Sequence, residues 1–305
     1  MPGTIASDGV FLHVEDRGSG DPILFLHEFA GDTASLDQQL DYFAGRFRCI
    51  AFNARGFDPS AAPDHPEQYG LSRAGQDLED VLDDRAVRSC HVVALSLGSA
   101  TALPFAISRP ERVRSLALVS WGYGMDPEGN AEFRRQSLLG AELIESDGMA
   151  AFVDLYERSP VRDACRSREP DRFRALMARM RARSPAGSAL TLRRLQALRP
   201  PLDEALLSEV RRCRVPTLIV TGDEDPPSHG PSLALHAALP DSELHVLRGG
   251  GHTLYLERPD ELNGIIEAHL ERSASRASRP DGTVLPTAPN LDGPAPASRE
   301  ASPWH

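Results

Sequence analysis

Short apolar runs of strand length alternate with longer segments of helical periodicity along most of the chain. Six runs are almost continuously apolar, which is typical of strands covered on both faces of a parallel sheet; they span residues 23–27, 48–52, 91–95, 115–120, 217–221 and 243–247. Residues 10–16 alternate between apolar and polar side chains, which predicts an exposed, antiparallel edge strand. Helical spacing occupies residues 36–47, 71–87, 97–109 and 259–270. The alternation predicts an α/β fold with a mostly parallel, doubly wound sheet.

One segment interrupts this alternation. Residues 126–207 contain only helical patterns, at 132–145, 148–157, 171–183 and 188–197, and therefore predict an all-helical insertion between two core strands. We divide the chain into a core in two parts, residues 1–122 and 208–272, the helical insertion, residues 123–207, and a tail, residues 273–305. The tail is rich in Ser, Ala, Pro and Arg, a composition that buries too little apolar surface to fold, so we expect it to be disordered.

The charged residues narrow the possible chemistry. The chain carries 33 basic residues, all of them arginine, and 44 acidic residues, for a formal net charge of -11. The absence of lysine excludes a phosphate-loop lysine, a Schiff-base lysine and a lysine general base. The acidic balance argues against nucleic-acid binding, which depends on cations that neutralise phosphates. Five arginines crowd in the insertion, where we interpret them as a solvated helix face rather than an anion site: Arg172, Arg174, Arg179, Arg181 and Arg183.

The four cysteines, Cys49, Cys90, Cys165 and Cys213, lie more than 40 residues apart. This spacing matches neither a zinc site nor a redox motif, so we expect free thiols and no bound metal. Residues 1–10 lack the basic and apolar segments of a signal peptide, and no apolar run is long enough to span a membrane. We expect a cytoplasmic monomer or homodimer that acts without a membrane, a nucleic acid or a cofactor.

The strongest chemical signal is the run His-Val-Val-Ala-Leu-Ser-Leu-Gly-Ser at residues 91–99, in which a strand enters a small-x-Ser-x-Gly turn and a helix follows at once. A serine at such a turn is held in a strained conformation that projects its hydroxyl above the sheet. Ala94 and Gly98 are small enough to let strand and helix backbones approach. The helix N-terminus also favours a developing negative charge. We therefore predict that Ser96 is a nucleophile; the alternative is a serine that caps the helix.

A nucleophilic serine needs a base, and the base needs an acid to orient it. His252 ends the run Arg-Gly-Gly-Gly-His between the last strand and a helix, and three glycines let that loop bend back over the sheet; His229 is the only serious rival. The acid should follow another strand, and residues 223–225 (Asp-Glu-Asp) meet this condition. The residues alone do not choose among these three carboxylates, but the order serine, acid, histidine is known for this triad.

With these motifs together, residues from about 8 to 272 resemble the α/β-hydrolase superfamily, specifically serine hydrolases with a helical cap between the sixth and seventh strands. Residues 25–29 (Phe-Leu-His-Glu-Phe) are similar to the oxyanion loop, usually His-Gly-x, and residues 53–56 (Asn-Ala-Arg-Gly) are similar to the Asp-x-Arg-Gly loop. Residues 110–116 are similar to the stretch that leads into the sixth strand. The insertion is then the cap. The family's Gly-x-x-Asp pattern, counted from Gly222, implies that the acid is Asp225, with Asp223 second.

The resemblance also implies an oxyanion hole formed by the backbone N–H groups of Phe29 and Leu97. Two residues depart from the family pattern: Glu28 replaces the usual glycine, and Asn53 the usual aspartate. Glu28 is either turned away from the site and paired with an arginine, or lines the pocket and affects substrate charge or His252. Trp121 and Tyr123 stand at the entrance to the cap, where they either contact the substrate or pack the hinge.

These assignments predict a cofactor-free hydrolase of a small, partly apolar ester, lactone or related acyl compound. A serine nucleophile argues against epoxide hydrolysis and dehalogenation as the activity, since both reactions need a carboxylate nucleophile. Carbon–carbon bond hydrolysis and cofactor-free peroxidation remain open, because similar residue sets perform them. A non-hydrolytic small-molecule receptor on the same fold is the alternative from a different functional class.

Overall fold

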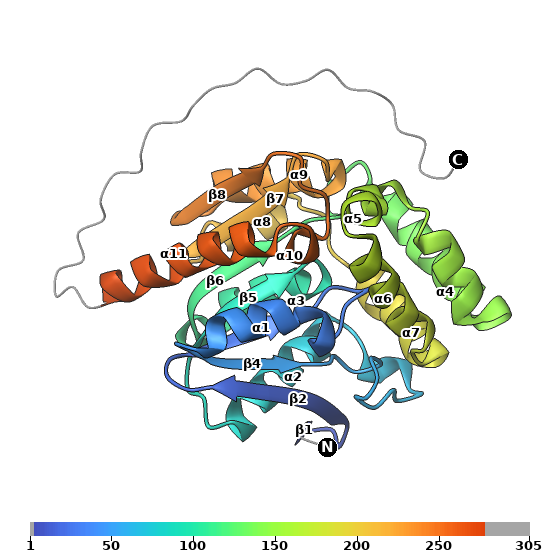
Figure 1. Cartoon of the computed structure of the whole chain (residues 1–305), viewed down its shortest axis with the longest axis horizontal. Helices are drawn as coiled ribbons and strands as arrows, with labels where there is room; N and C mark the ends of the chain where they lie inside the picture. The colour runs from blue at the N-terminus through green and yellow to red at the C-terminus, as the bar shows by residue number, and fades with distance from the viewer. Residues whose placement is uncertain (1–2, 278–305) are drawn as a thin grey trace.

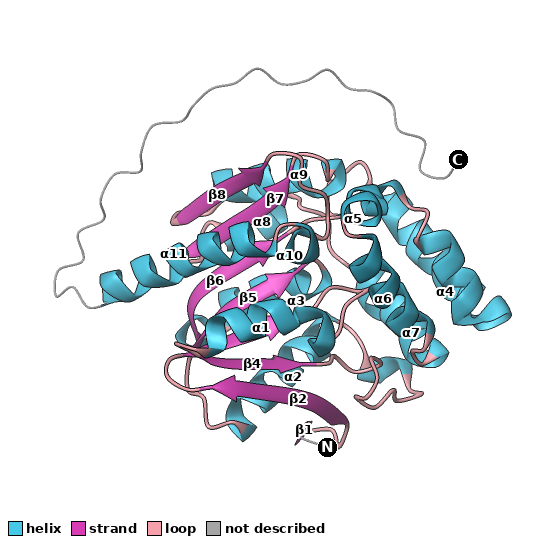
Figure 2. Ribbon diagram, viewed as in Figure 1, coloured by secondary structure: helices cyan, strands magenta, loops and turns pink. Residues whose placement is uncertain are grey.

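A twisted sheet of eight strands in the order β1-β2-β4-β3-β5-β6-β7-β8 forms the centre of the molecule (Figures 1 and 2). The computed structural model describes residues 3–277. The strands are β1 (Gly3–Ile5), β2 (Phe11–Gly18), β3 (Pro22–Leu26), β4 (Arg48–Phe52), β5 (Cys90–Leu95), β6 (Val113–Val119), β7 (Thr217–Gly222) and β8 (Ser242–Leu247). β2 pairs antiparallel with β1 and β4, and the other neighbouring strands run parallel.

The six apolar runs of the sequence become β3 to β8, so the predicted mostly parallel sheet is confirmed. The antiparallel direction of the strand over residues 10–16 is also confirmed, but its position at the edge is wrong. β2 is paired on both sides, and the strand outside it is β1. β1 has only three residues, too few to show an alternation of period two.

Successive side chains of the central strands enter two different cores. Ile23 and Phe25 of β3 belong to the core beneath helices α1 (Asp37–Ala44) and α11 (Pro259–Ala277). Leu24 and Leu26 belong to the core on the opposite face, beneath the helices α2 (Leu71–Asp84), α3 (Leu97–Ser108), α8 (Glu204–Val210) and α9 (Pro226–Ala238). Because neighbouring strand residues point to opposite faces, a sheet covered on both sides requires strands that are apolar almost throughout.

Four further helices lie together at the end of the sheet to which the parallel strands point, and they form the cap (Figure 1). They are α4 (Asn130–Tyr156), α5 (Asp163–Arg168), α6 (Pro170–Arg181) and α7 (Pro185–Thr191), with the 3₁₀ turn η4 (Pro160–Arg162) and the π-helical turn η5 (Leu192–Gln196). α4 joins two of the predicted helical segments, and Gly148, with a φ of 85°, interrupts its helical geometry. The remaining short elements are η1 (Thr33–Leu36), η2 (Pro66–Gln68), η3 (Pro110–Arg112) and α10 (Leu254–Glu257).

Cap and core approach closely at a pair of glycines. A Cβ atom added to Gly187 of α7 would lie 2.6 Å from the Cα of Gly56, which follows β4. Gly56 also has a φ of 83°, a conformation that side chains disfavour. The two backbones therefore touch at a point where both residues are required to be glycine.

Two helices cross the segment boundaries expected from the sequence. α8 crosses the expected end of the insertion at residue 207, and its Val210 packs in the core beneath α8 and α9. α11 runs to Ala277, five residues past the expected boundary at 272, and the rest of the expected tail, residues 278–305, lies outside the described residues. All four cysteines are buried free thiols. Within residues 3–277 no helix is long and apolar enough to cross a membrane.

Candidate active site

Ser96 occupies the sharp turn between β5 and α3. Its φ of 45° and ψ of −101° are strained for a residue with a side chain, a cost of about 1–3 kcal/mol that the surrounding packing sustains. A Cβ atom at Gly98 would lie 2.7 Å from the carbonyl oxygen of Leu26, so glycine lets α3 pass this close to β3. The turn holds the half-buried Ser96 side chain where β5 ends, as the strand–turn–helix pattern predicts.

The structure brings Ser96, His252 and Asp225 together from loops that follow β5, β8 and β7. His252 Nε2 lies 2.9 Å from Ser96 Oγ, and His252 Nδ1 lies 2.7 Å from Asp225 Oδ2. Asp225 is fully buried and His252 nearly so. When Nδ1 donates its proton to the carboxylate, Nε2 is left as an acceptor facing the serine hydroxyl. This geometry can activate the hydroxyl as a nucleophile.

The rival residues have other partners. Asp223 Oδ1 accepts a hydrogen bond of 2.6 Å from the backbone N–H of Gly249, so it supports the glycine-rich loop ahead of His252. Glu224 pairs with Arg168 of the cap at 2.6 Å. His229 lies on α9 and makes no hydrogen bond to Ser96 within residues 3–277. In the same part of the chain, no group of three or more His, Cys, Asp or Glu side chains is placed to hold a metal ion.

Ser96 and His252 open into a pocket beneath the cap with an empty volume of about 660 Å³. Its other lining residues are Phe29, Tyr123, Phe133, Gln136, Ser137, Phe152, Tyr156, Ser159, Val161, Arg162, Leu192 and Gln196. Most of the wall is aromatic or aliphatic, with a few polar groups, as in typical small-molecule sites. Most of these residues come from the cap, which the sequence marked as helical without indicating which side chains face the serine.

Phe29 and Leu97 supply two backbone N–H groups beside Ser96. Phe29 belongs to the loop after β3, residues 27–31 (the β3 loop), and Leu97 begins α3. Among the described residues neither amide donates a hydrogen bond, so both are available to an oxygen atom of a ligand. The two N–H groups that the family resemblance implies for an oxyanion hole therefore have no protein acceptor among the described residues.

Arg183 of the cap binds the backbone of the β3 loop. Its guanidinium donates to the carbonyl oxygens of Phe29 at 2.5 Å and Gly31 at 2.6 Å, and also to that of Ala30. The group also lies over the Phe57 ring, 4.7 Å from its centroid. Burial lowers the pKa of Arg183 to about 10, so the side chain remains a cation at neutral pH. The prediction of a solvated arginine face is wrong at this position.

Glu28 is turned toward the cap and paired with an arginine, which is the first of the two alternatives drawn from the sequence. Both of its oxygens accept hydrogen bonds from Arg162 of η4, and Oε1 also accepts one of 3.0 Å from the Tyr255 hydroxyl. Burial alone raises the pKa of Glu28, but attraction and hydrogen bonding from Arg162 outweigh it and hold the pKa below its usual value. Glu28 does not line the pocket; Arg162 does.

The two aromatic residues at the entrance to the cap differ in their roles. Tyr123 lines the pocket, and its ring meets that of His252 with centroids 5.7 Å apart. Trp121 does not line the pocket; it is fully buried in the core beneath α8 and α9, so packing is the one of its two expected roles that the structure supports. Asn53 fixes loops: its Oδ1 accepts from the Thr33 backbone N–H at 2.7 Å.

The chain belongs to the alpha/beta hydrolase family, whose sequence profile matches residues 10–265. It is similar to the putative 2-succinyl-6-hydroxy-2,4-cyclohexadiene-1-carboxylate synthase of Bacillus subtilis (strain 168), at 29% identity over 271 residues, 87% of this chain and 96% of that protein. The 2-hydroxy-6-oxononadienedioate/2-hydroxy-6-oxononatrienedioate hydrolase of Comamonas testosteroni is 26% identical over 278 residues, 83% of this chain and 89% of that one. A solved thermophilic esterase from Thermogutta terrifontis superposes with a TM-score of 0.77 at 22% identity, covering 88% of this chain and 97% of that one.

Proposed function

We propose that this alpha/beta hydrolase cleaves a small, partly apolar ester, lactone or related acyl compound through an acyl-enzyme at Ser96. The observation that carries the proposal is the hydrogen-bond chain from Ser96 Oγ through the His252 ring to Asp225. His252 Nε2 takes the hydroxyl proton while Ser96 Oγ attacks the carbonyl carbon. The same proton then passes to the leaving group as its bond to carbon breaks. Water, deprotonated by His252, releases the acid and restores the serine.

The other groups act on the geometry and charge of this reaction. Asp225 keeps the His252 proton on Nδ1 and stabilises the imidazolium that forms when Nε2 accepts a proton. The N–H groups of Phe29 and Leu97 would donate to the oxyanion of the tetrahedral intermediate. Preorganised donors of this kind typically contribute about 3–4 kcal/mol each to the lowering of the barrier.

The pocket wall supports a small substrate with apolar character. Phe29, Phe152 and Leu192 offer apolar surface close to Ser96, and Gln196 and Arg162 offer hydrogen-bonding groups.

The direct test is the turnover of short p-nitrophenyl esters, followed by release of p-nitrophenol, for the wild-type chain, Ser96→Ala, His252→Ala and the double variant. Loss of a triad nucleophile lowers kcat by roughly 10⁶, and residues that act as one unit give a double variant little worse than either single one. We expect this pattern. Multiplying losses would contradict the joint role of the two residues. A wild-type chain that binds these esters without turnover would favour the small-molecule receptor.

Carbon–carbon bond hydrolysis is a second candidate, and Arg199 is the observation that favours it. Arg199 does not itself line the pocket. It is buried against the Phe133 ring and donates to the carbonyl oxygen of Tyr123, two residues of the pocket wall, and within the described residues it has no carboxylate partner and two unpartnered nitrogens, Nε and Nη2. Its positive charge would favour an acidic substrate, such as the dioate that the Comamonas testosteroni relative is named for. The test is the loss of dienoate absorbance with 2-hydroxy-6-oxononadienedioate as substrate, compared with ester turnover by the same preparation.

A further inference from the structure

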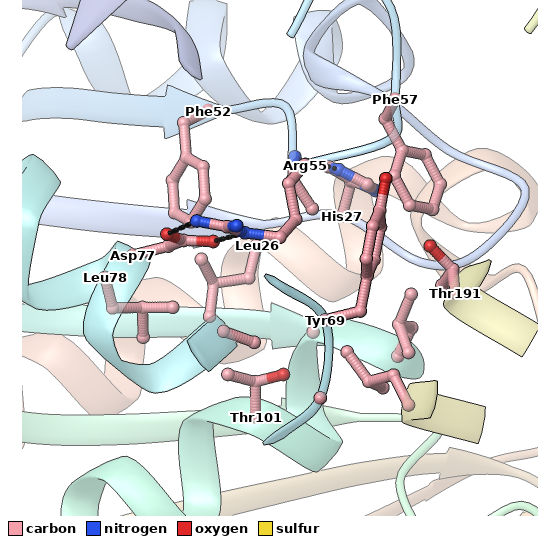
Figure 3. A pocket seen from close by; sticks show the side chains of 16 residues that line it. Leu26, His27, Phe52, Arg55, Phe57, Tyr69, Asp77, Leu78, Thr101 and Thr191 are labelled. Carbon is pink, nitrogen blue, oxygen red and sulfur yellow. Dashed lines mark hydrogen bonds and ion pairs between the residues drawn. The ribbon is translucent and has the colours of Figure 1, made fainter. Parts of the chain in front are cut away.

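A second cavity lies between the core and the cap (Figure 3). Its walls come from the ends of β3 and β4, from α2 and α3, and from the cap residues Thr191 and Leu195. Neither Ser96 nor His252 lines it. Most of the surface is apolar, including the side chains of Leu26, Phe52, Phe57, Leu78, Leu97 and Leu195. The site described above does not account for this cavity.

Two helical segments separate the second cavity from the Ser96 pocket. On α3, Leu97 and Thr101 face the cavity, one turn apart, while Ser96 immediately precedes them in the pocket. On the cap, Thr191 and Leu195 line the cavity, whereas Leu192 and Gln196 line the pocket. Residues four apart share a helix face, so each segment presents one face to each space.

The charged groups in the cavity wall already have partners. Arg55 donates to both oxygens of Asp77, at 2.7 and 2.6 Å, and further to Asp8 and the carbonyl of Gln68. His27 Nε2 accepts a hydrogen bond of 3.0 Å from the Ala54 N–H, and its Nδ1 lies 2.7 Å from the carbonyl oxygen of Glu28. A charged ligand would therefore lose its hydration without gaining a free counter-charge, which selects for an uncharged molecule.

Tyr69 is the exception among the polar groups. Its side chain stands between the Arg55–Asp77 pair and Thr191 (Figure 3), it is 5% exposed, and its hydroxyl has no hydrogen-bond partner among the described residues. Burial raises the pKa of Tyr69, so the hydroxyl keeps its proton and is a donor. A buried hydroxyl without a partner is costly, and a ligand oxygen would satisfy it.

We infer that this cavity is a second ligand site, for a small, uncharged, largely apolar molecule with a single hydroxyl group, such as a phenol. The apolar part of the ligand fills the space between α2, α3 and η5, and its oxygen accepts the hydrogen bond from Tyr69. The inference does not depend on the reaction proposed for Ser96, because it rests only on the residues that line the cavity and on the Tyr69 hydroxyl without a partner.

Binding of p-cresol and of toluene, measured by ligand-observed NMR and calorimetry on the full chain, tests this inference. We expect saturable binding of p-cresol that Ala74→Leu and Thr101→Leu abolish, since both enlarge side chains in the cavity wall. Ser137→Leu fills the Ser96 pocket instead and should leave p-cresol binding intact. Ser72→Leu, on the exposed face of α2, should also leave this binding intact. Tyr69→Phe should weaken p-cresol by about 3- to 10-fold, the value of one hydrogen bond, and leave toluene unchanged.

Three results would overturn the inference. The first is the absence of saturable binding. The second is binding that Ser137→Leu removes and Ala74→Leu keeps, which would locate the probe in the Ser96 pocket. The third is an equal effect of Tyr69→Phe on p-cresol and toluene, which would exclude the hydrogen bond. Circular dichroism and melting temperature verify that each variant is folded. Because Ala74→Leu and Thr101→Leu lie on different helices, the test still holds if one of these two variants does not fold.

Discussion

Arg162 and Glu28 form a bidentate ion pair across the boundary between cap and core. Arg162 Nη2 lies 2.8 Å from Glu28 Oε2, Nη1 lies 3.1 Å from Oε1, and both side chains are almost completely buried. Arg162 also donates to the hydroxyl of Thr253, the residue after His252. One cap arginine thus holds both the β3 loop and the chain beside the histidine.

A double-mutant cycle on this pair should show strong coupling. Arg162→Met leaves the Glu28 carboxylate buried without its counter-charge, and Glu28→Gln leaves the arginine unbalanced; removal of one partner of a buried pair typically costs about 3–5 kcal/mol. The double variant should be destabilised by clearly less than the sum of the two single losses. Urea unfolding monitored by circular dichroism provides the measurement. Additive losses would show that the pair contributes no interaction of its own.

Asp225 and Asp223 should respond very differently to replacement by asparagine. Asp225→Asn should preserve the fold and lower kcat by about 10⁴, because the amide favours the wrong tautomer of His252. Asp223→Asn should be mild, since the Asn side-chain oxygen can still accept the hydrogen bond from Gly249. Steady-state ester kinetics distinguish the two. If Asp223→Asn were the crippling change, the acid would be two residues earlier than proposed.

Arg183 should act on the rate through the backbone of the β3 loop. Arg183→Gln replaces a donor to three carbonyl oxygens by a shorter one, so the Phe29 N–H should lose its fixed position. We expect kcat to fall by about 10- to 100-fold, with KM little changed, since loss of one oxyanion donor costs about 10²–10³ in rate. Arg181→Gln, which removes only contacts to Asp154, Glu157 and a carbonyl on the cap, should leave both constants near the wild-type values.

Arg183→Gln also needs a measurement that a loss of stability alone would not affect. Binding of a boronic acid, which forms a tetrahedral adduct with Ser96, should weaken in proportion to kcat, while binding of a neutral product analogue should not. Arg183→Lys, which keeps the charge but has its N–H donors on a single nitrogen, should recover part of the rate. Equal weakening of both ligands would contradict a positioning role.

His27 should make the chain less stable as the pH falls below neutrality. Burial lowers the pKa of His27 to about 4, and in the unfolded chain the pKa is about 6.5. The unfolded state therefore takes up the proton first, and stability that is fully present above pH 6.5 declines as the pH falls toward 4. At pH 5 the loss is about 2 kcal/mol. Protonation would also remove the acceptor that Nε2 offers to Ala54.

Unfolding free energies measured by urea denaturation between pH 7 and pH 5 test this expectation. His27→Gln should flatten the dependence by about the amount stated, because the variant has no group that titrates in this range at that position. His65→Gln, at an exposed site in the loop before η2, is the matched control and should follow the wild type. Identical slopes for wild type and His27→Gln would exclude this residue as the source.

The parts of the site that sequence could predict are those whose signal is local. Ser96 stands out because strand, turn and small neighbours are adjacent in the chain, and His252 because three glycines precede it. The local sequence alone does not identify Asp225 as the acid, because its two acidic neighbours have the same local setting. Only the family pattern separates the three residues. The three-dimensional reason for the choice is the pairing of Asp223 with Gly249 and of Glu224 with Arg168.

The cap contacts could not be predicted in this way, because they depend on how one folded layer docks on another. Arg183 carries the same helical signal as the exposed Arg174, and only docking shows that one reaches the β3 loop while the other faces solvent. Arg162 likewise has no pattern that links it to Glu28, 134 residues away. The role of Trp121 stays open at the level of sequence for a related reason: an aromatic residue at a hinge suits a pocket and a core equally well until the packing is known.

The glycine contact between α7 and the loop after β4 bears on chimeric proteins. The two backbones touch, so a cap from another protein fits only if it has glycine at this position, since any side chain at Gly187 would collide with Gly56. Arg162 and Arg183 extend the same dependence to the β3 loop. A cap transplanted from a relative would therefore have to travel with the core loops that it contacts, and the smallest exchangeable unit in this protein is larger than the helical insertion.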